Sequence, residues 1–143
     1  MIRVGIAAVL SLCVAEKVVA QDKAIRFGEM TIGKDGGDVV KETTVMTLRE
    51  NFFYGWIAQA KEGTRSVKVK EIISVPKSGY NFKGEKITTR TQIVEKEKEL
   101  EVVAGRFGSK WKPDIMDPGG DYVISVTVDG VLLLETKFIL LPP

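Results

Sequence analysis

The most informative absence in this sequence is histidine: the chain has none, and its single cysteine is Cys13, near the N-terminus. Histidine is the usual general base near neutral pH and the commonest nitrogen ligand for metal ions. Its absence excludes a Ser-His-Asp triad, a Cys-His pair and an ordinary zinc site. Paired carboxylates, a Ser-Lys pair and calcium bound by oxygen ligands remain possible. We therefore expect no cofactor and no metal, and an enzyme is not the preferred interpretation.

The chain also lacks a strong excess of charge of one sign. Its 21 basic and 19 acidic residues give a formal net charge of +2. Such a balance produces no long-range field that would attract nucleic acid or anionic lipid. We therefore expect no nucleic-acid partner.

An apolar run long enough to span a bilayer is missing as well. The longest run, Val4–Ala15, follows a basic start and is shorter than the about 20 residues that a transmembrane helix needs. Small residues at Val18 and Ala20 then precede a polar segment. This pattern predicts a secretory signal peptide over residues 1–20. We expect an exported protein, periplasmic or secreted, whose mature domain (21–143) does not insert stably into a membrane.

Two other interpretations of the N-terminal segment are open. It could be a packed helix or strand of a cytosolic protein, but its apolar residues are not confined to one face of a helix. It could also be a lipoprotein signal ending at Cys13, but a bacterial lipobox needs a small residue before the cysteine, and Leu12 is large. The secretory signal peptide is therefore preferred.

The rest of the chain reads as a series of short strands. From Ala24 onward the apolar spacing is mostly two, and valine, isoleucine, threonine and aromatic residues dominate. The predicted strands cover Ala24–Gly33, Val39–Leu48, Phe52–Ala60, Ser66–Val75, Glu85–Val94, Leu100–Ala104, Tyr122–Val128 and Val131–Leu141. Glu95–Glu99 is predicted as a charged turn. About seven short strands imply an all-β, antiparallel sandwich or a small barrel.

Three local signals refine this prediction. Phe52–Ala60 is apolar on nearly every residue, which is typical of a central strand covered on both faces. Asp129-Gly130 predicts a two-residue type I′ turn between the last two strands. Gly120-Asp121-Tyr122, where the chain enters a strand, resembles the tyrosine corner of immunoglobulin-like domains. An immunoglobulin-like sandwich is the preferred fold.

The same features carry a family resemblance. They are the aromatic-rich Phe52–Trp56, the strand-ending Pro76, the Pro-Gly-Gly-Asp-Tyr segment that ends at Tyr122, and the Leu-x-x-x-Phe strand Leu134–Phe138. Together they resemble an uncharacterised family of small secreted bacterial proteins with an immunoglobulin-like β-sandwich domain. The resemblance spans Ile25–Leu141. It implies the fold and export, and it supplies no catalytic residues.

The best candidate site lies in Gly105–Gly120, which we predict to be a long loop because it contains four glycines and two prolines. The candidate partner-binding residues interleave two aromatic side chains with three cations: Arg106, Phe107, Lys110, Trp111 and Lys112. An exposed Trp111 between cations could anchor a protein, stack on a sugar or bind an anionic polymer. Alternatively, Trp111 or Phe107 folds back to close the open end of the sandwich.

Two groups of carboxylates are candidate sites, but their sequence patterns favour a structural role. Asp114, Asp117 and Asp121 lack the alternating oxygen pattern of a calcium loop and are ordinary turn residues. The acidic residues of Glu95–Glu99 alternate with lysines, which is typical of a solvated surface. We therefore predict no metal site and no catalytic residues.

These observations favour an exported, non-catalytic binding module for a protein or glycan partner. Its recognition surface would be the loop 105–120 or an exposed sheet edge at Glu85–Val94. One alternative is an exported inhibitor or accessory subunit of an envelope hydrolase. A second is a glycan hydrolase that uses two carboxylates facing each other across a groove.

Overall fold

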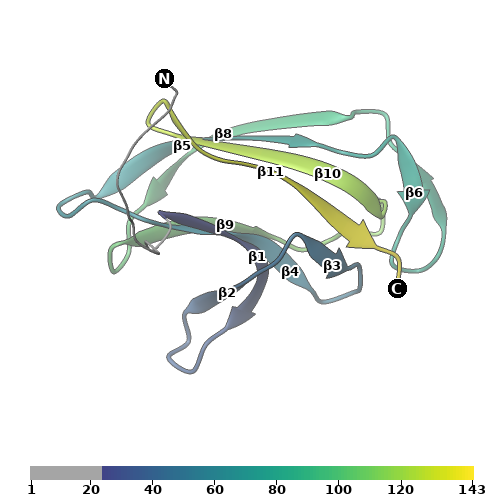
Figure 1. Cartoon of the computed structure of the whole chain (residues 1–143), viewed down its shortest axis with the longest axis horizontal. Coiled ribbons are helices and arrows are strands. Elements are labelled where there is room, and N and C mark those ends of the chain that lie inside the picture. Colours follow the sequence, from purple (N-terminus) through teal and green to yellow (C-terminus); the bar gives the residue numbers. More distant parts are fainter. Residues whose placement is uncertain (1–23) are drawn as a thin grey trace, which may run out of the picture.

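The computed structural model describes residues 24–143, which form two β-sheets packed face to face and one small hairpin (Figure 1). The four-stranded sheet has the order β2 (Asp38–Glu42), β1 (Ile25–Ile32), β4 (Phe53–Gln59) and β9 (Arg106–Trp111). The five-stranded sheet has the order β3 (Val45–Thr47), β11 (Val131–Leu141), β10 (Gly120–Val128), β5 (Ser66–Ser74) and β8 (Ile93–Glu101). The hairpin consists of β6 (Ser78–Tyr80) and β7 (Lys86–Thr88).

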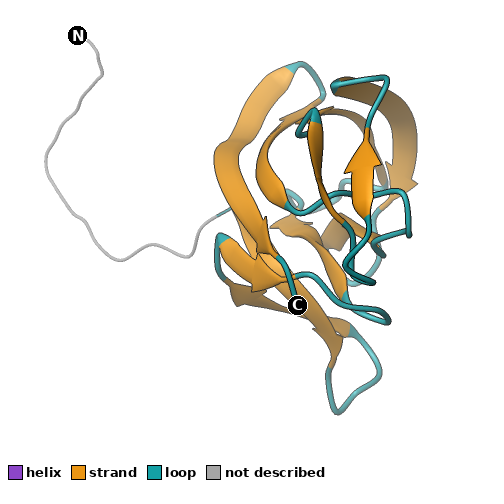
Figure 2. Cartoon of the chain, turned by 90° about the vertical axis from the view of Figure 1, so that its right-hand side faces the viewer, coloured by secondary structure: helices purple, strands orange, loops and turns teal. Residues whose placement is uncertain are grey.

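The predicted all-β sandwich is confirmed. All strand pairs are antiparallel except β3 with β11, which is parallel. Figure 2 shows strands and connecting loops throughout the described residues. No helix in this part of the chain has the length and apolar character needed to cross a bilayer. The predicted signal peptide lies outside the described residues.

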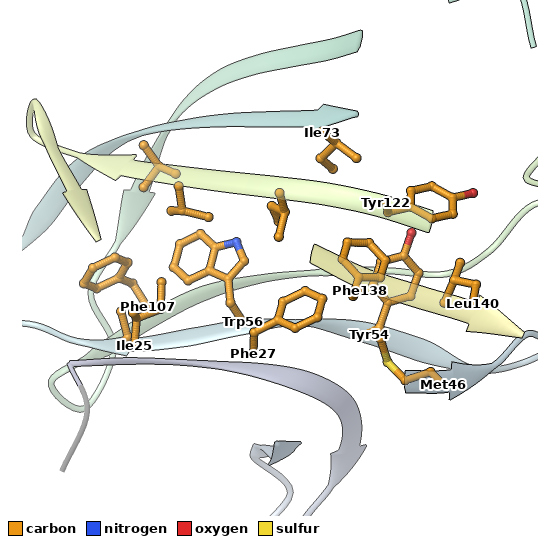
Figure 3. Close-up of a cluster of buried hydrophobic side chains, with 14 of the residues drawn as sticks. Ile25, Phe27, Met46, Tyr54, Trp56, Ile73, Phe107, Tyr122, Phe138 and Leu140 are labelled. Carbon is orange, nitrogen blue, oxygen red and sulfur yellow. The ribbon is translucent and has the colours of Figure 1, made fainter. Parts of the chain in front are cut away.

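The core lies between the two sheets and is rich in aromatic side chains (Figure 3). Phe138 is at its centre, fully buried, with its ring 4.9 Å from Phe27, 5.4 Å from Tyr54 and 5.0 Å from Tyr122. These rings come from β1, β4, β10 and β11, so one cluster fixes both sheets against each other. Aromatic pairs at such distances stabilise a fold beyond the area that they bury.

The two strongest local predictions are confirmed. Asp129 and Gly130 both have positive φ angles, 48° and 83°, as a type I′ turn requires. They join β10 to β11 in an antiparallel hairpin. The Tyr122 hydroxyl donates a hydrogen bond to the Pro118 carbonyl oxygen at 2.6 Å, which is the contact that defines a tyrosine corner.

The structure divides residues 24–143 into eleven strands where about seven were predicted. The predicted strand Val39–Leu48 is in fact two strands, because β2 pairs with β1 while β3 joins the other sheet. The Thr43 hydroxyl lies between them and accepts the Val45 N–H at 3.1 Å. Such a local side-chain bond competes with the strand ladder and turns the chain. Three-residue strands such as β6 and β7 carry too short a pattern to be seen in the sequence.

The predicted edge strand Glu85–Val94 is wrong. Its first part is β7, which pairs with β6, and its last residues begin β8. Thr89 ends β7 by donating its hydroxyl to the Pro76 carbonyl at 2.7 Å, and Gln92 donates its amide to the Thr89 carbonyl at 3.0 Å. The chain therefore turns at these residues instead of continuing as a strand.

The predicted charged turn Glu95–Glu99 is also wrong, because these residues lie in the middle of β8. β8 is an edge strand, paired with β5 along its whole length. Its glutamates are exposed, and two of them contact β5 side chains: Glu95 pairs with Lys70 at 3.2 Å, and Glu99 accepts the Ser66 hydroxyl at 3.1 Å. Alternating charge is compatible with a strand when the neighbouring strand supplies partners.

Candidate functional site

The cluster of aromatic and basic residues lies on a strand, so the predicted loop 105–120 is wrong in its first half. Residues 106–111 form β9, the edge of the four-stranded sheet. Side chains of a strand alternate between its two faces. Phe107 and Trp111 therefore point toward the five-stranded sheet, while Arg106 and Lys110 point outward.

Both aromatic residues of the cluster belong to the core. Phe107 is buried and meets Trp56 edge to face at a centroid distance of 5.8 Å. Trp111 is half-buried, with its ring 5.6 Å from the Tyr54 ring. The structure therefore shows the alternative in which these side chains fold inward. Lys112, exposed just beyond the end of β9, remains with the outward-facing cations.

Three glycines lie on the outer face of the four-stranded sheet, on neighbouring strands. Gly28 on β1 pairs directly with Gly55 on β4, and Gly108 lies on β9. A Cβ at Gly28 would collide with the Lys41 carbonyl, and one at Gly55 with the Ser109 carbonyl. The neighbouring backbones approach so closely that only glycine fits.

The β1–β2 turn lies close to β9 on this face of the sheet. β2 and β9 are separated by β1 and β4 in the hydrogen-bonded order, yet Lys110 on β9 reaches Asp38 at the start of β2 with a nitrogen–oxygen distance of 2.9 Å. Between them runs a groove of about 490 Å³. We call it the hairpin groove; its lining includes Met30, Asp35, Asp38, Ile57, Arg106, Gly108 and Lys110.

Most charged side chains that line the hairpin groove have a partner within the protein. Asp38 holds Lys110, whose ammonium also lies 5.1 Å from the Phe53 ring centroid, as in a cation–π contact. Asp35 accepts the Gly37 N–H at 3.0 Å and so stabilises the turn. Arg106 differs: within residues 24–143 its guanidinium forms no hydrogen bond and no ion pair.

Arg106 also joins the hairpin groove to a neighbouring hollow. A second groove, of about 280 Å³, shares Arg106, Asp35, Asp38 and Ile57 with the first and continues toward Ala24. Arg106 therefore lies where the two grooves meet, and its guanidinium is close to Gly37 of the β1–β2 turn. A planar cation in this place is suited to bind a carboxylate of a partner.

On the inner side of β9, the structure contains a buried polar network that sequence reasoning missed. Glu71 on β5 is 1% exposed and accepts the Trp56 indole N–H at 2.7 Å. Its other carboxylate oxygen lies 3.0 Å from the Lys98 ammonium, in an ion pair without hydrogen-bond alignment. Lys98 also donates to the Ser109 hydroxyl at 2.7 Å. The Glu71 carboxylate thus links β5 to β4 and β8, and Lys98 extends the network to β9.

A sequence signal for this network existed. Val67, Val69 and Ile73 alternate along β5 and all face the core, and Glu71 occupies the position between them on that same face. A charged residue at an inward position needs a buried partner. The register supplies β8, whose Lys96 and Lys98 share the inner face.

The remaining candidate carboxylates lie in or beside turns. Among residues 24–143, no group of three or more acidic, cysteine or histidine residues is placed to hold a metal ion. Asp114 and Asp117 stabilise their own turn, as Asp117 accepts the Asp114 N–H at 2.7 Å. In the hairpin groove, Asp35 and Asp38 lie on one wall, in the same turn, and not across the groove from each other. This geometry does not support a two-carboxylate hydrolase.

Burial raises the pKa values of three groups near the tyrosine corner. The pKa of Tyr54 is raised by burial and then by the charge of Asp117. That of Tyr122 is raised by burial, then by Tyr54 and Asp117. For Asp117, burial raises the pKa, the Asp114 N–H lowers it, and the Asp114 charge raises it. These groups support the fold and lie away from the hairpin groove.

Comparisons with known proteins agree with this architecture. Residues 25–141 match a family model described as the PM0630 beta sandwich domain. Among solved structures, the chain is similar to an immunoglobulin-like protein from Pseudomonas aeruginosa, with a TM-score of 0.54 and 15% identity over 83% of this chain and 93% of that chain. This likeness confirms the predicted immunoglobulin-like fold and says nothing of function.

A more distant likeness is to the Pseudomonas fluorescens alkylpurine DNA glycosylase AlkC bound to DNA containing an abasic site analog. Its TM-score is 0.39 at 14% identity, over 85% of this chain and 31% of that chain. A similarity at this level carries no inference. No curated protein gives a significant match to the chain.

Proposed function

Since the chain belongs to the PM0630 beta sandwich domain family, we propose that it is an exported, non-catalytic binding module that recognises an acidic group of a protein or glycan partner in the hairpin groove. Export is supported by the signal-peptide pattern of residues 1–20. The absence of histidine from the chain, and of facing carboxylates from the groove walls, favours binding over catalysis.

The observation that carries this proposal is the state of Arg106. Asp38 and Lys110 form an ion pair and Asp35 accepts a backbone N–H, whereas the Arg106 guanidinium has no partner within the described residues. An arginine fork binds a carboxylate through two parallel hydrogen bonds, which gives both affinity and orientation. Ile57 and Met30 beneath it provide apolar contact area.

The residues predicted from the sequence now divide into two roles. Arg106, Lys110 and Lys112 would contact the partner from the outer face. Phe107 and Trp111 would act from the inner face by holding β9 in place. Alanine at Phe107 would therefore destabilise the domain itself, so it does not test recognition.

The test is affinity capture from the native envelope with the mature domain as bait. Arg106→Glu should reduce capture of the specific partner about tenfold or more, because it replaces attraction by repulsion. Arg90→Glu is the matched control: Arg90 is exposed and absent from both grooves. Both variants should keep the unfolding midpoint of the wild type.

Equal capture by wild type and a folded Arg106→Glu variant would overturn the assignment of the groove. A captured hydrolase whose activity falls on mixing with the domain would identify the module as its inhibitor.

A further inference from the structure

β9 has a free edge. In an antiparallel pair, residues alternate between directing both backbone polar groups at the neighbouring strand and directing both away. The Ala60 N–H donates to the Gly105 carbonyl at 2.8 Å, so Gly105 faces β4. By alternation Phe107 and Ser109 also face β4, whereas Gly108 and Lys110 direct their N–H and C=O groups away from it.

No other part of the described chain fills this edge. The backbone groups of Arg106 are satisfied by Val103, through bonds of 2.9 and 3.0 Å in the turn that precedes β9. Gly108 and Lys110 have no such partner in residues 24–143. Gly108 carries no side chain that would hinder an approaching strand. An additional strand could therefore form ladder hydrogen bonds at these two residues.

β9 lacks one protection of an edge strand, an inward-pointing charge. Such a charge would have to be buried by an added strand and so discourages pairing. The inward side chains of β9 are Phe107, Ser109 and Trp111, none of them charged. Its charges lie on the outer face instead, so they would meet the side chains of an added strand without having to be buried.

Those outward charges define the chemistry of the strand that fits. Arg106, Lys110 and Lys112 follow β9 along its outer side, and β9 contains no acidic residue. Side chains directly opposite each other on adjacent strands interact, and opposite charges there are favourable. The complementary segment is extended, with acidic residues at alternate positions.

We propose that β9 is the docking edge for an extended acidic segment of a partner protein, which adds as a further strand of the four-stranded sheet and places a carboxylate on Arg106. This inference rests on the proposed function of the hairpin groove and names its partner class. The backbone ladder at Gly108 and Lys110 would supply affinity, and the outer cations would select acidic side chains.

A second copy of this chain is the less suitable source of such a strand. β8 carries exposed glutamates at alternate positions, Glu95, Glu97, Glu99 and Glu101. However, its inner face carries Lys96 and Lys98, and pairing of β8 with β9 would bring these cations beside the apolar inner face of β9. A partner strand with small or apolar residues on that face fits better.

The experiment uses the mature domain and the synthetic peptide acetyl-Thr-Glu-Thr-Glu-Val-Glu-Thr-Glu-Thr-amide, with a version in which lysine replaces each glutamate. Binding is measured by isothermal titration calorimetry, and amide hydrogen exchange is followed with and without peptide. We expect the acidic peptide to bind at least about tenfold more tightly than the lysine peptide. The amides of Gly108 and Lys110 should gain protection, while those of Phe107 and Ser109 should not change.

Two backbone-methylated peptides separate strand addition from recognition by side chains alone. Methyl groups on the alternate nitrogens that face β9 should abolish binding, and methyl groups on the other nitrogens should leave it unchanged. Arg106→Glu should weaken the acidic peptide about tenfold, and Arg90→Glu should not.

Other outcomes would overturn the inference. Binding that depends on Arg106 but tolerates methylation at every position would overturn strand addition, while the proposed function of the groove would stand. Binding of polygalacturonate without binding of the acidic peptide would have the same two consequences, because the groove would then bind an acidic glycan. Self-association of the domain that competes with peptide would identify a second copy as the occupant. If neither probe binds and envelope capture ignores Arg106→Glu, both proposals fail.

Discussion

β8 and β9 are two edge strands of the same sandwich, but the side chains on their inner faces differ: lysines on β8 and apolar residues on β9. They follow each other in the chain and meet through the contact of Lys98 with Ser109, but belong to different sheets. β8 is long and turns lysines inward, where Glu71 neutralises one of them. β9 is shorter and turns an apolar face inward. An inward charge closes an edge to other strands, whereas an apolar inner face leaves it open.

The inward lysines of β8 require a buried counter-charge. A lysine can point into a sandwich only if the interior holds a counter-charge, because an unpaired buried charge is strongly destabilising. Glu71 provides it and is itself held by the Trp56 indole. One buried carboxylate thus permits the closed edge of β8. β9 needs no such support, because its charged side chains lie on the outer face, where Asp38 pairs with Lys110.

The largest expected effect comes from removing this counter-charge. Glu71→Ala would leave Lys98 facing the interior without its partner and the Trp56 N–H without an acceptor. We expect a loss of about 3 kcal/mol in the free energy of unfolding, measured by urea denaturation. Glu71→Gln keeps an acceptor for Trp56 and should lose less. A loss below about 1 kcal/mol in Glu71→Ala would show that the network does not hold the sheets together.

The next effect comes from the position of β9. A Cβ at Gly108 would collide with the Trp56 carbonyl of the neighbouring strand, so Gly108→Val should push β9 away from β4. We expect a loss of about 2 kcal/mol in the free energy of unfolding and weaker peptide binding. Gly37→Ala is the control, since its Cβ would make only ordinary contacts, at 3.4 Å or more. Equal unfolding midpoints for the two variants would contradict the close approach.

Removing an inward lysine from β8 should allow this edge strand to pair with other strands. Lys96 is exposed at the rim of the inner face and has no role in the Glu71 network. Lys96→Val should therefore change the free energy of unfolding by less than about 0.5 kcal/mol, while self-association through β8 increases. Light scattering after gel filtration measures the oligomeric state over a concentration series. Lys86→Val on β7 is the control, and self-association of both variants to the same extent would deny β8 a protective role.

The smallest effect on stability is expected at the hairpin groove. Asp38 and Lys110 are both half-exposed, and such surface ion pairs contribute little to stability. Asp38→Asn should change the free energy of unfolding by less than about 0.5 kcal/mol. It should strengthen binding of the acidic peptide about threefold by freeing Lys110. Weaker binding instead would mean that Asp38 positions Lys110 for the partner.

The parts of the fold that the sequence predicted are those with local causes. The type I′ turn needs two residues with positive φ, and Asp129-Gly130 is such a pair. The tyrosine corner is formed within a few residues of Tyr122. The strand alternation of Phe52–Ala60 depends on side chains of one segment and correctly placed β4 at the centre of its sheet. The same pattern also predicted that both faces of β4 are covered, but Phe53 and Ile57 on its outer face are only half-buried.

The failures have causes outside the segment concerned. Gly105 and Gly108 made β9 resemble a loop, yet Gly108 is required by a backbone approach of β4 that no local pattern reveals. The charges of β8 resembled a turn because their partners, Lys70 and Glu71, are supplied by β5. The sequence therefore indicates which residues belong to the candidate site. It does not indicate that they divide into an inner apolar face and an outer basic face, because that division depends on strand pairing in the sheet.

The three glycines of the four-stranded sheet have a consequence for redesign of the hairpin groove. At Gly28, Gly55 and Gly108 the main chains of neighbouring strands pack so closely that a Cβ would collide with a backbone carbonyl. Substitutions there would move the backbone itself. Arg106 and Ile57 line the groove with side chains, and exchanging them changes its charge and polarity without such a collision. Engineering of altered selectivity should begin with those wall positions and leave the glycines untouched.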